Sequence, residues 1–274
     1  MKLVNSREII KNAQSNDYAI PQFNINNLEW AKCILSVSEE KKNPIILGVT
    51  KNVIGYIGGC KTIVNFVNGL IFDLKITVPV VLHLDHGRTL NDCIQAVEAG
   101  FTSIMIGTDQ CETMQEKIAL VKNIVEYGKS KNVTVETELG SFDKENYVFC
   151  VEECVEMIKK TNVSTFAPAL GSKHGMSKCS VDFKQMEQLH NRIDIPLVLH
   201  GGSGLSDDEI KTAISLGCCK ININTENMVI WTNGVKKYLL DNPNEFNPRK
   251  IIDAGVVDMS NNISHRIDVI YNKI

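Results

Sequence analysis

The stretch Pro196-Leu-Val-Leu-His-Gly-Gly-Ser-Gly204 joins a short apolar run to a histidine and a glycine-rich tetrad. The apolar run is bounded by turn residues, which predicts a buried strand ending at His200. The glycines allow backbone N–H groups to close on an anion, and the helix predicted from Ser206 adds a favourable dipole. We therefore expect a metal ligand or an acid–base group beside a phosphate site at the end of this strand.

Seven further stretches have the same short, apolar and β-branched character, which is typical of strands buried on both faces. Helical patterns separate them, notably over 27–41, 89–99, 114–131 and 206–216, where apolar residues fall on one stripe and caps mark the ends. This alternation predicts an α/β fold, a (β/α)8 TIM barrel in one domain over 1–274 with extra C-terminal helices over roughly 244–274. The eight predicted strands are 18–23, 44–49, 79–83, 103–106, 133–138, 165–168, 196–200 and 219–223.

Composition narrows the class of protein. The net charge of −3 gives no electrostatic reason to expect a nucleic-acid partner, and no apolar run is long enough to span a membrane. The N-terminus lacks the apolar core of a signal peptide. The nine cysteines form no CxxC pair, which favours buried, reduced thiols over disulfides or a zinc knuckle. We expect a cytoplasmic enzyme or binding protein.

Three histidines at or just beyond predicted strand ends are each followed directly by glycine: His86, His174 and His200. In a TIM barrel the carboxyl ends of the strands form one face, so these side chains should meet there. Three histidines with one open position are typical of catalytic zinc. Asp85 would lie at the same rim and suits proton transfer. We interpret His83 as an inward residue behind this site, and His190 and His265 as surface residues.

Motifs spread over nearly the whole chain fit one pattern: Phe23-Asn-Ile-Asn-Asn27, Leu82-His-Leu-Asp-His-Gly87, Glu136-Thr-Glu-Leu-Gly140, Ala167-Pro-Ala-Leu-Gly-Ser-Lys-His-Gly175, Leu197-Val-Leu-His-Gly-Gly-Ser-Gly204, Lys220-Ile-Asn-Ile-Asn-Thr-Glu226 and Asn247-Pro-Arg249. In these motifs the chain resembles a known family, the class II, zinc-dependent ketose-bisphosphate aldolases, which include fructose- and tagatose-1,6-bisphosphate aldolases. The resemblance spans nearly the whole chain and implies the same barrel.

The resemblance implies reversible aldol cleavage of a ketose 1,6-bisphosphate to dihydroxyacetone phosphate and an aldehyde. It implies that His86, His174 and His200 bind Zn²⁺, with Glu138 at an alternative metal position, and that Asp85 is the acid–base group. It also implies a monovalent cation (Na⁺ or K⁺) and a homodimer or homotetramer. Its implied substrate contacts are Gly175, Lys178, Gly201, Gly202, Ser203, Asn222, Asn224 and Thr225 for the first phosphate and the three-carbon unit, and Asn24, Thr50 and Arg249 for the far phosphate, the arginine coming from a neighbouring subunit.

The chain departs from the family pattern at two places. The aspartate usual at the end of the fourth strand is Gly107, and Asp109 could replace it only if the loop bends back. The loop after Gly140 is short, and Glu145 is the candidate in it for proton transfer at the three-carbon unit. These departures leave an alternative function open, a non-catalytic or weakly active sugar-phosphate-binding paralogue.

Two other readings compete with zinc-dependent aldol cleavage. A Schiff-base aldolase would use Lys173 or Lys220, since a buried lysine can have a lowered pKa. The three histidines count against it. A metal-dependent hydrolase on the same barrel commonly begins with His-x-His after its first strand, whereas this strand ends in Gln22-Phe-Asn24.

Overall fold

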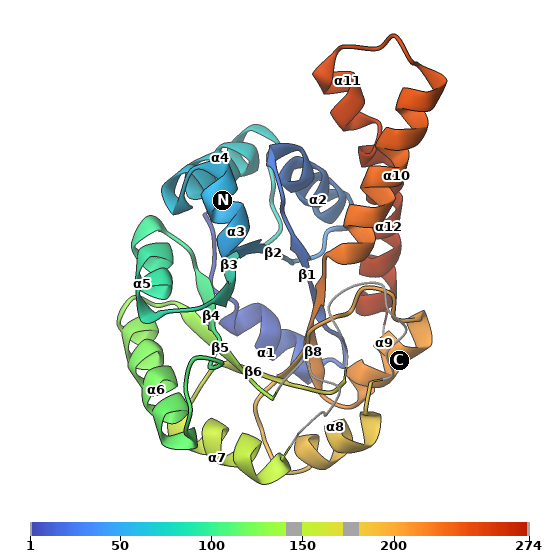
Figure 1. The fold of residues 1–274 in the computed structure, drawn as a ribbon. Helices are drawn as coiled ribbons and strands as arrows, with labels where there is room; N and C mark the ends of the chain where they lie inside the picture. The colour runs from blue at the N-terminus through green and yellow to red at the C-terminus, as the bar shows by residue number, and fades with distance from the viewer. Residues whose placement is uncertain (1, 141–149, 172–180, 273–274) are drawn as a thin grey trace.

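The fold places eight parallel strands in a closed barrel, in the order β1 to β8, as the sequence predicts. The computed structural model describes residues 2–140, 150–171 and 181–272 (Figure 1). The strands are β1 Ile20–Asn24, β2 Ile45–Thr50, β3 Val80–Gly87, β4 Ser103–Ile106, β5 Thr134–Leu139, β6 Thr165–Pro168, β7 Leu197–Leu199 and β8 Cys218–Ile223.

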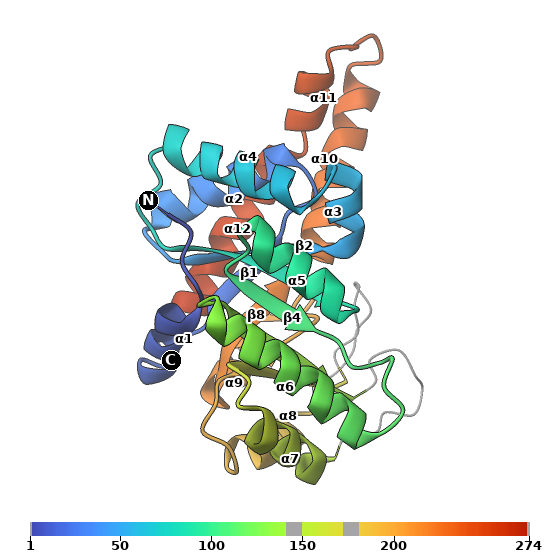
Figure 2. The same cartoon turned by 90° about the vertical axis from the view of Figure 1, so that its left-hand side faces the viewer.

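Helices surround the barrel, and Figure 2 shows α5 and α6 packed outside the strands. Their bounds are α1 Arg7–Ser15, α2 Leu28–Lys41, α3 Lys51–Ile57, α4 Cys60–Asp73, α5 Leu90–Ala99, α6 Met114–Ser130, α7 Val151–Thr161, α8 Phe183–His190, α9 Asp207–Ser215, α10 Thr225–Asp241, α11 Pro248–Asp253 and α12 Val256–Tyr271. Capping boxes begin α5, α6 and α9 at Thr89, Thr113 and Ser206. Each satisfies backbone donors that a helix start leaves without partners.

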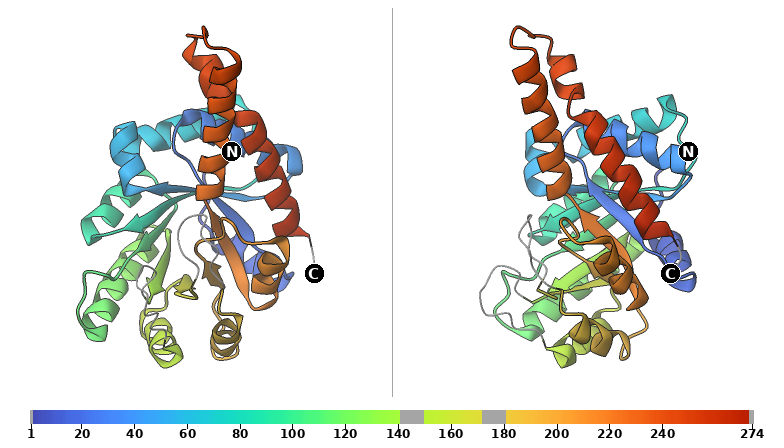
Figure 3. Two further views of the ribbon diagram at one scale, coloured as in Figure 1. Left: turned by 45° about the vertical axis from the view of Figure 1, so that its right-hand side comes forward. Right: turned by 90° about the vertical axis from the view of Figure 1, so that its right-hand side faces the viewer.

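The C-terminal helices form an arm that leaves the barrel and returns. Helix α10 runs outward from β8, α11 lies at its outer end, and α12 comes back beside α10 to pack against α2 (Figures 1 and 3). Helices α11 and α12 lie in the extension expected over 244–274, whereas the arm also includes α10. Helix α12 packs against β1 as well, so it covers the barrel like the helices of the outer ring.

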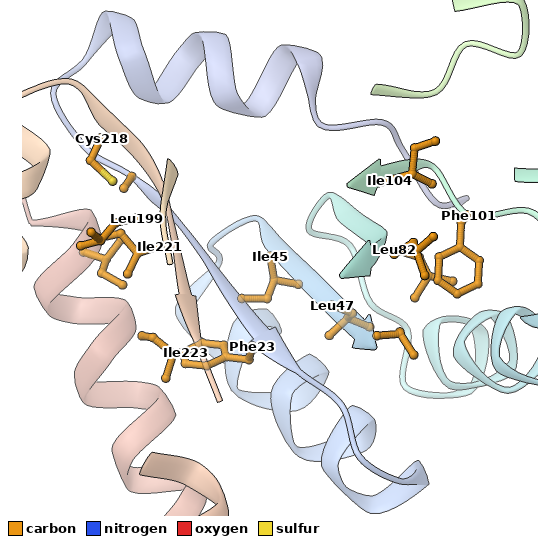
Figure 4. Close-up of a cluster of buried hydrophobic side chains, with 14 of the residues drawn as sticks. Phe23, Ile45, Leu47, Leu82, Phe101, Ile104, Leu199, Cys218, Ile221 and Ile223 are labelled. Atoms are coloured by element: carbon orange, nitrogen blue, oxygen red, sulfur yellow. The ribbon is translucent and has the colours of Figure 1, made fainter. Parts of the chain in front are cut away.

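The core has two parts. One lies between the strands and the outer helices, and Figure 4 shows Phe23, Leu47 and Ile223 in it. The other is an apolar plug in which α1 packs against inward residues such as Ile20 and Val81. Alternate residues of a strand face opposite sides. The residues two and four positions after Ile20 and after Val81 therefore also face inward. These inward residues are polar, and they build the site.

The observed strand bounds differ from the predicted ones mainly at the site. Strand β3 continues to Gly87, four residues beyond the predicted end, and β7 ends at Leu199, one residue before His200. The eight cysteines that the structure describes are free, and five are buried. Burial raises the pKa of Cys93 to about 12 and that of Cys33 to about 11. Within the described ranges, no helix has the length and apolarity needed to cross a membrane.

Candidate active site

Asp85 and His86 are consecutive residues of β3, yet both line one cavity. In a regular strand they would point to opposite faces. Here His86 has a φ of +57°, and the pairing of β3 with β4 shifts register between Leu84 and Gly87. Such an irregularity turns one extra side chain toward the same face. A positive φ is uncommon outside glycine, and strained positions of this kind cluster at functional sites.

His86, Glu138 and His200 bring one ligand atom each to within 4.8 Å of one another. His86 Nδ1 lies 3.4 Å from Glu138 Oε1, and His200 Nδ1 lies 3.3 Å from Glu138 Oε2. Burial raises the pKa of Glu138, but the bonds from His200 and His86 outweigh it and lower the pKa to about 2. Positive charge is therefore favoured between these groups. Nitrogen and carboxylate donors suit a divalent metal such as zinc.

Glu136 fixes His200 from the barrel interior. His200 Nε2 lies 3.0 Å from Glu136 Oε1, and Lys220 Nζ lies 2.8 Å from Glu136 Oε2. Burial lowers the pKa of His200, but Glu136 and Glu138 raise it to about 9. A carboxylate on one ring nitrogen orients the other nitrogen of a metal-ligating histidine. Here it directs Nδ1 toward Glu138.

His83 lies in the same inward layer and is buried, as the sequence predicts. Its Nδ1 lies 2.8 Å from Ser103 Oγ. Burial, and then the charge of Lys220, lower the pKa of His83 to about 3, so the ring is neutral near pH 7. Lys220, a Schiff-base candidate, is ion-paired with Glu136 and does not line the cavity. The other candidate, Lys173, lies outside the described residues.

Lys220→Met removes the ammonium from this pair and leaves His200 as the remaining ion-pair partner of the buried Glu136 carboxylate among the described residues. Breaking a buried pair in this way costs about 3–5 kcal/mol. We expect the free energy of unfolding, measured in urea, to fall by that amount. The double variant Lys220→Met/Glu136→Gln is the matched control, since it removes both charges and should recover most of the loss. An unfolding free energy unchanged in Lys220→Met would contradict this account.

The cavity at the carboxyl ends of the strands has a volume of about 240 Å³. Asp85 Oδ1 and Asn222 Oδ1 are buried there without a hydrogen-bond partner among the described residues. Leaving a buried oxygen unsatisfied costs about 1–3 kcal/mol, so these atoms point to a bound group that satisfies them. The residues that line the cavity were all predicted from sequence as site residues: Asn24, Thr50, Asp85, His86, Gly201, Ser203, Asn222, Asn224 and Thr225.

The glycine loop, Gly201–Gly204, packs against β8. A Cβ at Gly202 would lie 2.6 Å from Ile221 Cγ2, so no side chain fits there. The N–H of Gly202 donates to the carbonyl of Asn222 at 2.9 Å, so this N–H is not available for the phosphate contact predicted at Gly202. Ser203 Oγ accepts from the N–H of Asn224 at 3.1 Å. The groups along the cavity wall that can still contact a phosphate are Gly201, Ser203 and the N-terminus of α10.

Arg266 of α12 anchors this loop. Its Nη2 donates to Glu226 Oε2 at 2.8 Å and to the carbonyl of Leu205 at 3.0 Å. Glu226 Oε2 also accepts from the N–H of Gly204 at 3.2 Å. Because Arg266 lies on the returning helix of the arm, the arm and the glycine loop hold each other in place.

Gly107 leaves room beside the metal-ligand cluster. A Cβ there would lie 3.7 Å from Glu138 Oε1, an ordinary contact, so the backbone leaves space for a side chain to begin beside Glu138. Asp109 is exposed and does not line the cavity. The structure therefore does not bring Asp109 to the position of the missing carboxylate.

Several predicted site residues lie elsewhere. Arg249 is exposed on α11 at the outer end of the arm, where its Nε donates to Asn247 Oδ1, and it does not line the cavity of its own chain (Figure 1). The remaining predictions fall outside the described residues: Glu145, His174, Gly175 and Lys178.

Glu136 and Gln22 have no role predicted from sequence, although both lie in the polar inward layer. A signal for each was present, because Glu136 precedes Glu138 by two residues and Gln22 precedes Asn24 by two. Residues two apart on a strand share a face. A polar residue at such a position predicts a contact with the site residue beside it.

Comparisons with known proteins identify the family of this chain. A family model described as class-II fructose-bisphosphate aldolase matches residues 4–273. A fructose-bisphosphate aldolase of Geobacillus stearothermophilus is 44% identical over 265 residues, covering 93% of this chain and 92% of that protein. A 6-phospho-5-dehydro-2-deoxy-D-gluconate aldolase of Bacillus licheniformis is 40% identical, covering 97% and 94%. The crystal structure of the YdjI aldolase from Escherichia coli superposes with a TM-score of 0.85 at 27% identity, covering 98% of this chain and 97% of that one.

Proposed function

The chain belongs to the class-II fructose-bisphosphate aldolase family, and from that premise we propose that it cleaves a ketose 1,6-bisphosphate of the fructose or tagatose type. The reaction is reversible and gives dihydroxyacetone phosphate and an aldehyde. One observation carries the proposal: Asp85 and His86, with Glu138 and His200 beside them, meet at a cavity bounded by the glycine loop. That combination supports the proposal, because it would supply a base, a metal site and a phosphate site within one volume.

Zn²⁺ is the metal that we propose here. The donors of half-buried His86 and of buried His200 and Glu138 fit it, and His174 would complete the predicted set of three histidines. When bound, the metal supplies Lewis-acid stabilisation of the negative charge that develops on the three-carbon fragment. A monovalent cation is part of the proposal on the family resemblance alone.

Asp85 performs the proton transfer that starts cleavage. Its carboxylate takes the proton of the C4 hydroxyl, the C3–C4 bond breaks, and C4 becomes the carbonyl carbon of the aldehyde. The electron pair stays on the three-carbon fragment, which must then accept a proton at C3; Glu145 is the predicted donor. Asp85 suits this step because Oδ2 is held by Asn24 at 2.7 Å, whereas Oδ1 has no hydrogen-bond partner among the described residues.

The test is cleavage by zinc-loaded protein of fructose 1,6-bisphosphate, tagatose 1,6-bisphosphate and 6-phospho-5-dehydro-2-deoxy-D-gluconate, with and without K⁺ or Na⁺. The third compound is included because relatives that are 40–42% identical carry that name. Turnover of one of the two bisphosphates supports the proposal. Binding of both without turnover at high enzyme concentration would instead favour the non-catalytic paralogue.

The assembly that we propose is a homodimer or a homotetramer in which Arg249 enters the site of a neighbouring subunit. Leu240 and Phe246 support it, because these arm residues are 82% and 91% exposed and gain stability when a second copy covers them. In the sequence, Arg249 follows Leu240 and Phe246 and precedes α12, so it belongs to the same arm.

Mixing two inactive variants tests this arrangement. Arg249→Ala and Asp85→Asn should each lose cleavage activity alone. After unfolding and refolding together, a mixed dimer holds one site with an intact Asp85 and a neighbour's intact Arg249. Random pairing then restores about a quarter of wild-type activity. No recovery in mixed dimers isolated by two affinity tags would contradict a shared site.

A further inference from the structure

A chain of three buried polar side chains leads from β1 to the proposed base. Gln22 Nε2 donates to Asn24 Oδ1 at 3.0 Å, and Asn24 Nδ2 donates to Asp85 Oδ2 at 2.7 Å. Gln22 is completely buried, and Asn24 and Asp85 are each 4% exposed. Buried hydrogen bonds of this kind fix side-chain positions, because an unsatisfied polar group in the interior is costly.

The direction of these bonds is set by the carboxylate. Ionised Asp85 only accepts hydrogen bonds, so Asn24 must present its NH₂ group to it. The oxygen of Asn24 then faces Gln22, which must in turn present its own NH₂ group. Gln22 Oε1 is left buried without a hydrogen-bond partner. The fold therefore accepts an unsatisfied oxygen at Gln22. In return, the amide of Asn24 is held in the one orientation that donates to Asp85.

Gly48 provides the space for this arrangement. It lies opposite Asn24 in the β1–β2 pairing. A Cβ at Gly48 would lie 2.4 Å from both Asn24 Oδ1 and Gln22 Nε2, the two atoms of the first hydrogen bond. Any side chain at this position would therefore occupy the place of that bond.

We propose that Gln22 is a positioning residue for Asp85, acting through the amide of Asn24 in space left by Gly48. The inference rests on the proposed aldol cleavage, in which Asp85 takes the C4 hydroxyl proton. Gln22 touches no substrate atom in this account. It keeps Asp85 Oδ2 bonded and so aims Oδ1 at the cavity.

Gln22→Met tests the inference, because methionine has a similar length and no donor. The loss of orientation should lower kcat for cleavage about 10- to 100-fold, the range expected for a misplaced reacting group, while KM changes less than about threefold. Exchange of the C3 proton of dihydroxyacetone phosphate with deuterated water does not involve the C4 hydroxyl. It should stay within about twofold of the wild-type rate. Ile20→Val, two residues earlier on β1, is the control for lost packing and should change neither rate.

Gly48→Ala provides a second variant and should give the same split between cleavage and exchange. Cleavage that is unchanged in Gln22→Met, or cleavage and exchange that fall together, would overturn the inference. A crystal structure of Gln22→Met decides it independently of activity, because Asn24 should leave its 2.7 Å contact with Asp85; a retained contact overturns the inference. If wild-type protein cleaves no ketose phosphate, the proposed function fails, and that structure still decides the positioning.

Discussion

Asp85→Asn is expected to lower kcat for ketose-bisphosphate cleavage by about 100- to 10,000-fold, the usual contribution of a positioned acid–base group. Asparagine has nearly the same shape, so the cavity and the phosphate contacts remain. Its amide cannot take the C4 hydroxyl proton. Steady-state kinetics should show the loss in kcat, with a smaller change in KM.

Two controls make this result specific. Asp73→Asn, at the exposed end of α4, applies the same chemical change away from the cavity and should leave kcat unchanged. Deuterium exchange into dihydroxyacetone phosphate should persist in Asp85→Asn, because that reaction needs no base at C4. A kcat within tenfold of wild type would show that another group takes the C4 proton.

Removal of the divalent metal is expected to lower cleavage at least about 1,000-fold. Metal stabilisation of developing charge is worth several kcal/mol, and about 4 kcal/mol corresponds to that factor. Dialysis against a chelator followed by the cleavage assay measures the effect, and added Zn²⁺ should restore the rate. Full activity in metal-free protein, confirmed by elemental analysis, would contradict the zinc proposal.

His86→Ala locates that metal. His86 is the more exposed of the two described histidines in the cluster, so its loss disturbs the interior least. We expect bound zinc to fall below about 0.1 per chain, and cleavage to fall with it. The residues that surround the metal ligands cannot take the place of a lost ligand. His265→Ala is the matched control, because His265 is exposed and pairs only with Asp207 among the described residues. Its zinc content should equal that of wild type.

The barrel was predictable because each strand carries its own signal. Short apolar runs such as 103–106 and 165–168 recur between amphipathic helices, and that alternation alone predicts parallel strands buried on both faces. Thr89 and Ser206 likewise signal their helix starts by local hydrogen bonding. The described wall of the cavity consists of residues predicted from sequence, because the carboxyl ends of barrel strands form one surface.

The supporting residues were not predictable in the same way. Glu136 and Lys220 lie on β5 and β8, 84 positions apart in the chain, and their pairing depends on how the barrel closes. The same holds for Gln22, whose role depends on a hydrogen bond to Asn24 and on the missing side chain of Gly48. The spacing of Glu136 from Glu138 and of Gln22 from Asn24 indicates a shared strand face, but it does not say which side chains of other strands they contact.

The sequence by itself determined the eight-stranded barrel, the rim that carries the chemistry, and the candidates Asp85, His86 and His200. It could do so because strand period and strand ends are local properties of the chain. Only the tertiary structure decided that Asp85 and His86 face the same cavity, since that requires the positive φ of His86 and the register shift beside it. Only barrel closure brings Glu138 between the two imidazoles, because contacts between distant strands depend on register across the whole sheet.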